Sequence, residues 1–282
     1  MNDTTAVVPP ADDALKSLFP GNKPLIGTIH LEALPGAPRY RGASIKEIAE
    51  RATSDARRYV NGGIDGLIVE NEGDIPFLKP EFVGPETVAA LAVITAAVIE
   101  SVSLPVGVLC LANATHQSIA VAKATGAQFI RANQWANAYV ANEGLIEGAA
   151  ATTLRYRSAI YGHDIKVFAD VHVKHGSHAI VSDRSIAELT HDTEAFDADV
   201  LIATGQRTGN PTQVEEVQEI SSVASRPVLV GSGLNSANAG ALMTVADGAI
   251  VGSAMKEAGV WWNPVSVERT RDIVNAVDRI RR

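Results

Sequence analysis

The chain has 282 residues, of which 46% are hydrophobic and 20% are charged. This composition is that of a globular protein, excludes wholesale disorder, and permits one large domain or two small ones. The formal net charge is −8 at pH 7, so nucleic acid is not expected as the main partner, because binding its phosphates requires a basic face.

Residues 1–22 are expected to form a flexible N-terminal arm, because this segment holds Pro9, Pro10 and Pro20. The arm has no Lys or Arg before Lys16, which is not the pattern of a signal peptide. We therefore expect a cytoplasmic protein. Residues 23–282 are expected to form one domain.

Eight short apolar or β-branched runs follow the arm, and each predicts a strand. The expected strands are Leu25–His30, Gly66–Glu70, Val106–Leu111, Gln128–Ala132, Ile165–Val171, Val200–Thr204, Val228–Gly231 and Ala249–Gly252. A helical segment follows each of them, and the expected helices span residues 44–61, 85–101, 114–125, 143–161, 184–196, 212–224, 235–245 and 265–281. Strict strand–helix alternation indicates a parallel sheet, and eight units in this length predict a (β/α)8 TIM barrel. A doubly wound open sheet is the second candidate.

The most apolar stretch, residues 88–99, is interpreted as a buried helix, because a membrane span needs about 20 residues. No insertion into a membrane is expected. The single cysteine, Cys110, excludes an intrachain disulfide and a cysteine-rich metal site. It lies in an apolar run, so we interpret it as a packing residue.

The expected connections are short at one end of the sheet and long at the other. Helix-to-strand connections include Gly62-Gly63 and Gly126, whereas the strand-to-helix connections 31–43, 71–84 and 172–183 are long and polar. Active sites of TIM barrels lie on the face built by the strand-to-helix loops. We therefore expect the chemistry at that face.

Two glycine-bearing turns follow the last two expected strands, Gly231-Ser232-Gly233 and Gly252-Ser253. Without a Cβ such turns let backbone N–H groups approach an anion closely, and a helix N-terminus adds a favourable field. This is the recurrent phosphate site of TIM barrels, so a barrel of the phosphate-binding type with a small phosphorylated substrate is expected. The sequence holds no P-loop and no Rossmann fingerprint, and no cofactor is expected.

Polar side chains end several of the expected strands. Asp170, His172 and Lys174 alternate along one strand, so they share a face that we expect to point into the barrel. We expect Asp170 to share proton transfer with Glu70 across the barrel mouth, assisted by His172 or Lys174. Glu70 ends an apolar run and is the leading candidate for a general base, and His30 is a further acid–base candidate. The alternatives are a buried Asp170–Lys174 pair and a purely structural His30.

Arg131 is expected to hold a substrate anion or to pair with Glu70 or Asp170. A divalent metal bound by Glu70, Asp74 and Asp170 is an alternative, as is a Schiff-base role for Lys174. Further candidates for substrate binding at the strand ends are Asn113, Asn133 and Thr204.

Several of these motifs resemble the BtpA/SgcQ family, first noted for a role in photosystem I biogenesis or stability. The resemblance runs from about Leu25 to the C-terminus through segments such as IGTIHLEALPGAPR (26–39), GIDGLIVENEGDIPF (63–77), VFADVHVKH (167–175) and PVLVGSGLN (227–235). It implies a phosphate-binding TIM barrel. It also implies site residues at Glu70, Asn71, Asp74, Arg131, Asp170, Lys174, His175, Gly231 and Gly233.

The chain departs from the family pattern at two places. Relatives carry Arg-Asn-Asp after the third strand, where this chain has Ala112-Asn113-Ala114. They carry Thr-Asp-Gln-Gly before the fourth helix, where this chain has Ala141-Asn142-Glu143-Gly144. These changes indicate a divergent subgroup.

The leading hypothesis is an enzyme with acid–base chemistry on a small phosphorylated sugar or ribosyl compound. An isomerase, an epimerase, a lyase, or an enzyme of cleavage or transfer at C1 would each fit. One alternative is a non-catalytic assembly or stability factor for a photosystem-type membrane complex, with Trp261-Trp262 as the docking patch unless both side chains are packed. Another is a phosphosugar-binding sensor. A homo-oligomer is expected in each case.

Overall fold

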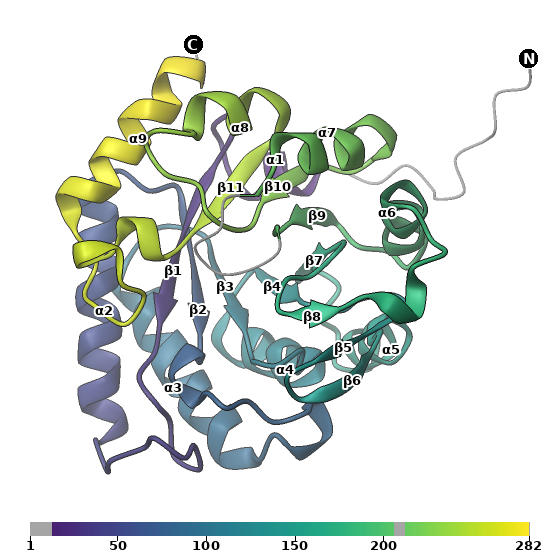
Figure 1. The fold of residues 1–282 in the computed structure, drawn as a ribbon. Helices are drawn as coiled ribbons and strands as arrows, with labels where there is room; N and C mark the ends of the chain where they lie inside the picture. The colour runs from purple at the N-terminus through teal and green to yellow at the C-terminus, as the bar shows by residue number, and fades with distance from the viewer. Residues whose placement is uncertain (1–12, 206–211, 282) are drawn as a thin grey trace, which may run out of the picture.

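The structure is a computed structural model that describes residues 13–205 and 212–281. Its centre is a closed barrel of parallel strands in the order β1-β11-β10-β9-β7-β4-β3-β2 (Figure 1). These strands are β1 (Leu25–His30), β2 (Gly66–Glu70), β3 (Val106–Leu109), β4 (Phe129–Ala132), β7 (Lys166–Asp170), β9 (Val200–Ala203), β10 (Val228–Val230) and β11 (Gly248–Val251). The TIM-barrel prediction is confirmed, and the open doubly wound sheet is excluded.

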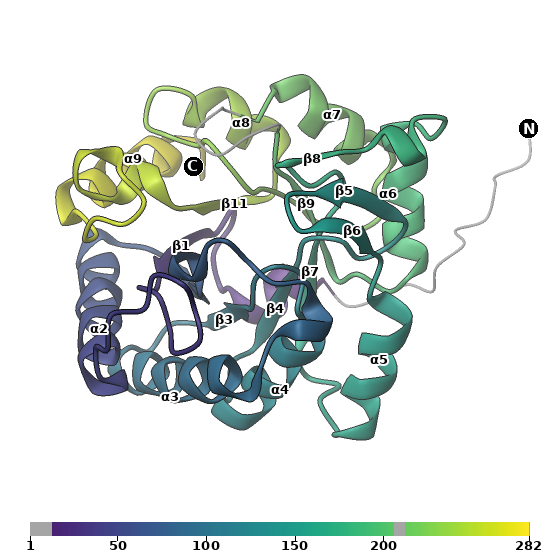
Figure 2. The ribbon, with the colours of Figure 1, turned by 60° about the horizontal axis from the view of Figure 1, so that its bottom comes forward.

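Helices surround the barrel on its outside (Figure 2). They are α2 (Ile45–Gly62), α3 (Pro85–Ser101), α4 (Thr115–Thr125), α5 (Ala150–Ala159), α6 (Ile186–Ala195), α7 (Val214–Val223), α8 (Ala239–Val245) and α9 (Val267–Arg281). At the start of α2, Ser44 and Glu47 form a reciprocal capping box, which satisfies backbone N–H groups that the first turn leaves free.

The apolar stretch 88–99 lies within α3, which buries Leu91, Ile94 and Val98 against the core. No helix in residues 13–205 and 212–281 combines the length and apolarity that a bilayer crossing requires. Cys110 is buried in the same core, and burial raises the pKa of its thiol to about 12. The packing interpretation of Cys110 is confirmed.

The N-terminal segment differs from our expectation. Residues 13–22 do not form a flexible arm, because α1 (Ala14–Leu18) is helical and Phe19 is buried at the base of the barrel. The Phe19 ring meets Phe129 edge-on at 6.3 Å, and Phe129 stacks on Phe168 at 4.4 Å. Burying these apolar side chains closes the barrel at its N-terminal end. Residues 1–12 of the expected arm lie outside the described residues.

A small antiparallel sheet replaces the first part of the expected helix 143–161. Its strands β5 (Ala138–Ala141), β6 (Gly144–Glu147) and β8 (Gly176–Ser177) lie in the order β6-β5-β8. The first residue of β6, Gly144, has φ +101°, a conformation that favours glycine and stops a helix. Tyr139, Ile146 and Val173 bury their side chains in a separate small cluster. Figure 2 shows this sheet beside β7 and β9.

Candidate functional site

The carboxyl ends of the barrel strands enclose a buried group of charges centred on Arg131. The Arg131 Nε and Nη2 atoms donate to the two carboxylate oxygens of Asp170, each at 3.0 Å. Its Nη1 lies 3.9 Å from Oε1 of Glu70. All three side chains are at least nine-tenths buried. The structure therefore confirms that Arg131 pairs with Asp170 and lies close to Glu70.

The carboxylate of Glu70 lacks a hydrogen bond to one of its two oxygens among the described residues. Within the part of the chain that the structure describes, its Oε1 atom is buried and accepts no hydrogen bond. Burial raises the pKa of the Glu70 carboxyl, against the opposing charges of Arg131 and Lys174. Buried polar atoms in folded proteins nearly always have partners, so an unpartnered carboxylate oxygen marks a place that a ligand or water completes.

His30 lies beside Glu70, with its Nε2 at 3.6 Å from Oε2. Its Nδ1 is 3.0 Å from the Trp261 carbonyl oxygen, which can only accept, so we assign the ring proton to Nδ1. Burial, with the charge of Lys256, lowers the pKa of His30 to about 3, so the ring is neutral and Nε2 is an acceptor. The hydroxyl of Thr28, at 3.0 Å, then donates to Nε2.

Lys174 joins the cluster from the loop after β7. Its Nζ atom donates to Oγ of Ser232 at 3.2 Å, across the barrel mouth. Burial lowers the pKa of the Lys174 ammonium, and the Arg131 charge lowers it further. The alternative of a mutually neutralising Asp170–Lys174 pair is wrong, because Asp170 is bound by Arg131.

Two charged residues near the site were missed by the sequence analysis. Glu72 opens the short helix η1 (Glu72–Asp74), and burial followed by the charge of Glu70 raises its pKa to about 7. Lys256 is fully buried, with its Nζ atom 3.3 Å from Oδ2 of Asp55. Glu72 could have been found from its place two residues after Glu70, which strand alternation would put on the same face. The strand ends at Glu70, however, so alternation does not strictly extend to Glu72.

Three expected substrate-binding residues serve instead to join the loops of the barrel mouth. Asp74 accepts from the Leu34 backbone N–H at 2.7 Å and from the Asn71 side chain at 2.8 Å. The Asn71 side chain in turn accepts from the Leu111 backbone N–H at 2.7 Å. Asn113 makes two hydrogen bonds of 2.9 Å to the backbone of Gln134. These amide and carboxylate groups have their partners within the protein.

The alternative of a metal held by Glu70, Asp74 and Asp170 is not supported by these contacts. Asp74 is engaged with the loops, and Asp170 is engaged by Arg131. Among the residues described, no group of three or more His, Cys, Asp or Glu side chains is arranged to hold a metal ion.

His172 does not share the position of Asp170 and Lys174. Its ring stacks on His178 at 3.8 Å, and His178 stacks on Tyr139 of β5 at 5.3 Å. The expected alternation fails because β7 ends at Asp170, so His172 lies in a loop. His175 is exposed at φ +70° in the same loop.

Two other expected residues support the cluster. Thr204 accepts from the Lys174 backbone N–H and donates to the His172 carbonyl, each at 3.1 Å. The Asn133 side chain donates to Asp170 at 3.2 Å. Both therefore fix the position of site residues.

The two glycine turns are shaped by close packing. A Cβ on Gly231 would lie 2.3 Å from Cγ2 of Ile202, and a Cβ on Gly252 would lie 2.7 Å from Oγ1 of Thr28. Gly233 has φ +74°, and Ser253 begins the short helix η4 (Ser253–Met255). Packing alone explains Gly231 and Gly252, so phosphate binding at these turns stays a prediction.

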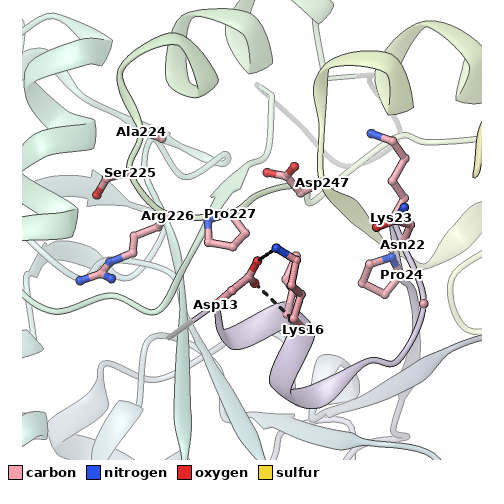
Figure 3. Close-up of a pocket in the computed structure, with 12 residues that line it drawn as sticks. Asp13, Lys16, Asn22, Lys23, Pro24, Ala224, Ser225, Arg226, Pro227 and Asp247 are labelled. Atoms are coloured by element: carbon pink, nitrogen blue, oxygen red, sulfur yellow. Dashed lines mark hydrogen bonds and ion pairs between the residues drawn. The ribbon is translucent and has the colours of Figure 1, made fainter. Parts of the chain in front are cut away.

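A cavity of about 440 Å³ lies at the opposite, N-terminal face of the barrel (Figure 3). Asp13 and Lys16 form an ion pair of 3.0 Å at its wall. The Lys23 ammonium there donates to the Ala246 carbonyl at 2.7 Å. Since these charges are satisfied and barrel chemistry lies at the other face, we place the candidate site at the Arg131 cluster.

Proteins of known sequence resemble this chain over most of its length. The sequence model of the BtpA family matches residues 21–279. An uncharacterized protein of Pyrococcus abyssi is 42% identical over 261 residues, covering 93% of this chain and 98% of that protein. The photosystem I biogenesis protein BtpA of Synechocystis sp. is 37% identical over 242 residues, covering 86% of this chain and 83% of that protein.

Solved structures also share the barrel. The N-(5'-phosphoribosyl)anthranilate isomerase from Pyrococcus furiosus aligns with a TM-score of 0.56 and 13% sequence identity. The alignment covers 91% of this chain and 99% of that chain. At this identity the likeness concerns the fold.

Proposed function

The chain belongs to the BtpA family, and we propose that it is an enzyme that carries out acid–base chemistry on a small phosphorylated sugar or ribosyl compound. The observation that carries this proposal is the buried Oε1 of Glu70, which accepts no hydrogen bond from the described residues although the cations of Arg131 and Lys174 act on the carboxylate. A scaffold protein gains nothing from such an arrangement, because burying a carboxylate oxygen without a hydrogen bond costs stability.

The acid–base pair in this proposal is Glu70 and Glu72. A group that exchanges protons at neutral pH works best when its pKa is near 7, and burial gives Glu72 such a pKa. Burial also raises the pKa of Glu70. Two carboxyl groups with different environments are the usual means by which one site supplies both an acid and a base.

Asp170 takes a positioning role. Its carboxylate is held by two hydrogen bonds from Arg131 and one from Asn133. It therefore orients the guanidinium, whose Nη1 faces Glu70 and would meet an oxygen of the substrate.

The phosphate of the substrate is proposed to bind at the Gly231–Gly233 and Gly252-Ser253 turns. Lys174 supports this choice, because its ammonium reaches Ser232 and would neutralise part of the phosphate charge. The solved isomerase of similar fold is, by its name, an enzyme of a phosphoribosyl compound, so the barrel type is compatible with such a substrate. Isomerisation, epimerisation, lysis, and cleavage or transfer at C1 all remain consistent with the site.

A second candidate function is assembly of a membrane complex, as the name of the Synechocystis relative indicates for that protein. One observation favours it here: the side chain of Trp262 is 68% exposed. A sensor that binds a phosphosugar without turnover is the third candidate. The homo-oligomer and the cytoplasmic location stay predictions.

A thermal-shift experiment separates these candidates. The full chain is heated with ribose 5-phosphate, glucose 6-phosphate or inorganic phosphate, each with and without Mg²⁺. A ligand at about 100 times its Kd adds about 2.7 kcal/mol to stability, which is a visible shift. The variant Gly233→Asp should lose the shift, because its carboxylate repels phosphate.

The matched control is Gly240→Asp, which adds the same charge at an exposed position with open space around it. It should keep the shift. If no phosphorylated compound shifts the wild-type protein, the phosphate site is wrong and the assembly function takes first place. If a ligand shifts it and no turnover of that ligand is detected, the sensor takes first place.

A further inference from the structure

A second cavity lies on the strand-to-helix face, beside the Arg131 cluster. Its volume is about 200 Å³, and it is lined by the β1–α2 loop and by two tryptophans of the β11–α9 loop. The lining includes His30, Glu32, Arg39, Gly73, Trp261 and Trp262. This volume is below the range of about 300–1,000 Å³ for sites of drug-sized ligands, so it suits a single ring system.

Trp261 is fixed in the wall of this cavity. Its backbone carbonyl accepts from Nδ1 of His30 at 3.0 Å, which ties the β11–α9 loop to β1. Its ring meets His30 edge-on, with centroids 5.8 Å apart and planes at 79°. The second tryptophan, Trp262, meets Trp261 edge-on at 5.3 Å and 88°.

Trp262 is the exposed member of the tryptophan pair. The residue is 68% exposed, so Trp262 is not packed against the last helix, and packing of this side chain against a partner subunit stays a prediction. An indole is large, rigid and apolar, so covering its exposed surface with a ligand ring removes apolar area from water. Trp262 contacts Trp261 and lies at the edge of a small cavity, so its indole can serve as a platform on which a planar ring stacks.

The charge at the rim of this cavity is positive on balance. Glu32 is neutralised by an ion pair with Arg51. Arg39 is exposed and has no ion pair within residues 13–205 and 212–281. A guanidinium beside an aromatic platform favours a planar ring with acceptor atoms, because it can stack on the ring or donate to its edge.

His30 connects this cavity to the rest of the site. Its Nε2 is 3.6 Å from Oε2 of Glu70. On its other side, a Cβ on Gly252 would lie 3.1 Å from Cε1 of the His30 ring. The cavity, the Glu70 carboxyl and the Gly252 turn therefore meet at one imidazole.

We propose that this cavity binds an aromatic heterocycle carried at C1 of a ribosyl phosphate, with the ring stacked on Trp262 and contacted by Arg39. The inference rests on the proposed function and narrows its substrate class. With the ring in the cavity and the phosphate at the glycine turns, the C1 substituent bond lies beside His30 and Glu70. Glu70, one of the two proposed acid–base groups, is then placed at the carbon that bears the ring.

The test is a binding titration of the full chain with matched probes. Adenosine 5'-monophosphate and uridine 5'-monophosphate carry a ring at C1, ribose 5-phosphate lacks it, and adenosine lacks the phosphate. Stacking of a base on an aromatic side chain changes affinity by about tenfold or more. At least one nucleotide should therefore bind about tenfold tighter than ribose 5-phosphate and should quench the fluorescence of the exposed indole.

The variant Trp262→Ala should remove this tenfold advantage and leave the affinity for ribose 5-phosphate unchanged, whereas Trp262→Phe should keep most of it. The control is Phe82→Ala, which removes a side chain that is 66% exposed in a different strand-to-helix loop. It should behave as the wild type.

Two results would overturn the ring site. In one, neither nucleotide binds more tightly than ribose 5-phosphate; in the other, Trp262→Ala weakens all phosphorylated probes equally. Failure of the proposed function has a different signature: ribose 5-phosphate and inorganic phosphate do not bind, while adenosine still quenches in a Trp262-dependent manner. Absence of binding by every probe overturns both.

Discussion

Arg131 and Asp170 form a fork-to-fork pair on adjacent barrel strands, with both hydrogen bonds at 3.0 Å. The pair is fully enclosed, which makes each partner costly to leave alone. Because two of the three guanidinium nitrogens are used by Asp170, only Nη1 is directed at Glu70. The geometry of the site therefore depends on Asp170, a residue that need not touch the substrate.

Replacing Asp170 by Asn should destabilise the protein strongly. The variant removes the negative charge and leaves Arg131 buried without its main counter-ion, which typically costs about 3–5 kcal/mol. Urea unfolding followed by circular dichroism measures the loss. The control is Glu50→Gln, which breaks an exposed pair of 3.9 Å with Lys46 and should change stability by less than about 1 kcal/mol. A loss of that same small size for Asp170→Asn would show that Arg131 does not need this partner.

The barrel was predictable from sequence because each of its strands is a short apolar run followed by a helix signal. Two additions were not. The first is the hairpin in residues 138–147. Its apolar and polar residues alternate over too short a stretch to distinguish a hairpin from the start of a helix. The second is the plug, by which we mean α1 and Phe19 closing the N-terminal end of the barrel. It depends on the contact of Phe19 with Phe129, and these residues are too far apart in the chain for a local sequence pattern to reveal the contact.

Removing the plug should lower stability without altering the opposite face of the barrel. Phe19→Ala deletes a buried aromatic ring and opens a cavity, which typically costs about 3–5 kcal/mol. Lys16→Ala is the control in the same helix, because its side chain is 81% exposed and should contribute less than about 1 kcal/mol. Both are measured by urea unfolding. Equal stabilities of Phe19→Ala and the wild type would mean that α1 does not seal the barrel in solution.

The candidate site was predictable as far as strand alternation extends. Glu70 and Arg131 were identified because they lie at or next to the end of a strand, where one face points inward. Beyond a strand end the rule no longer applies, which explains both the error at His172 and the omission of Glu72. The role of Asn71 and Asp74 in joining loops was also hidden, because hydrogen bonds to backbone N–H groups depend on the folded loop.

Glu72 should make stability fall as the pH rises. Its pKa in the folded protein is raised to about 7 from 4.5, so between these values the unfolded chain loses a proton that the folded protein keeps. The contribution of neutral Glu72 is fully present below pH 4.5 and is lost by about pH 7, at about 1.4 kcal/mol per pH unit. Unfolding at several pH values should show a flatter profile for Glu72→Gln than for the wild type.

The matched control for this profile is Glu81→Gln, an exposed glutamate in the following loop. Its profile should follow that of the wild type. Profiles that coincide for Glu72→Gln and the wild type would place the pKa of Glu72 near its ordinary value, and would remove it from the acid–base pair.

His30 should remain neutral, with its proton on Nδ1, well below the pH at which an ordinary histidine titrates. Burial lowers its pKa to about 3, and the Trp261 carbonyl holds the Nδ1 proton. Nitrogen-15 NMR at pH 5 should show a protonated Nδ1 and an unprotonated Nε2. A charged His30 at pH 5, or a proton on Nε2, would contradict the assignment, because Nε2 could then no longer accept the hydrogen bond from the Thr28 hydroxyl.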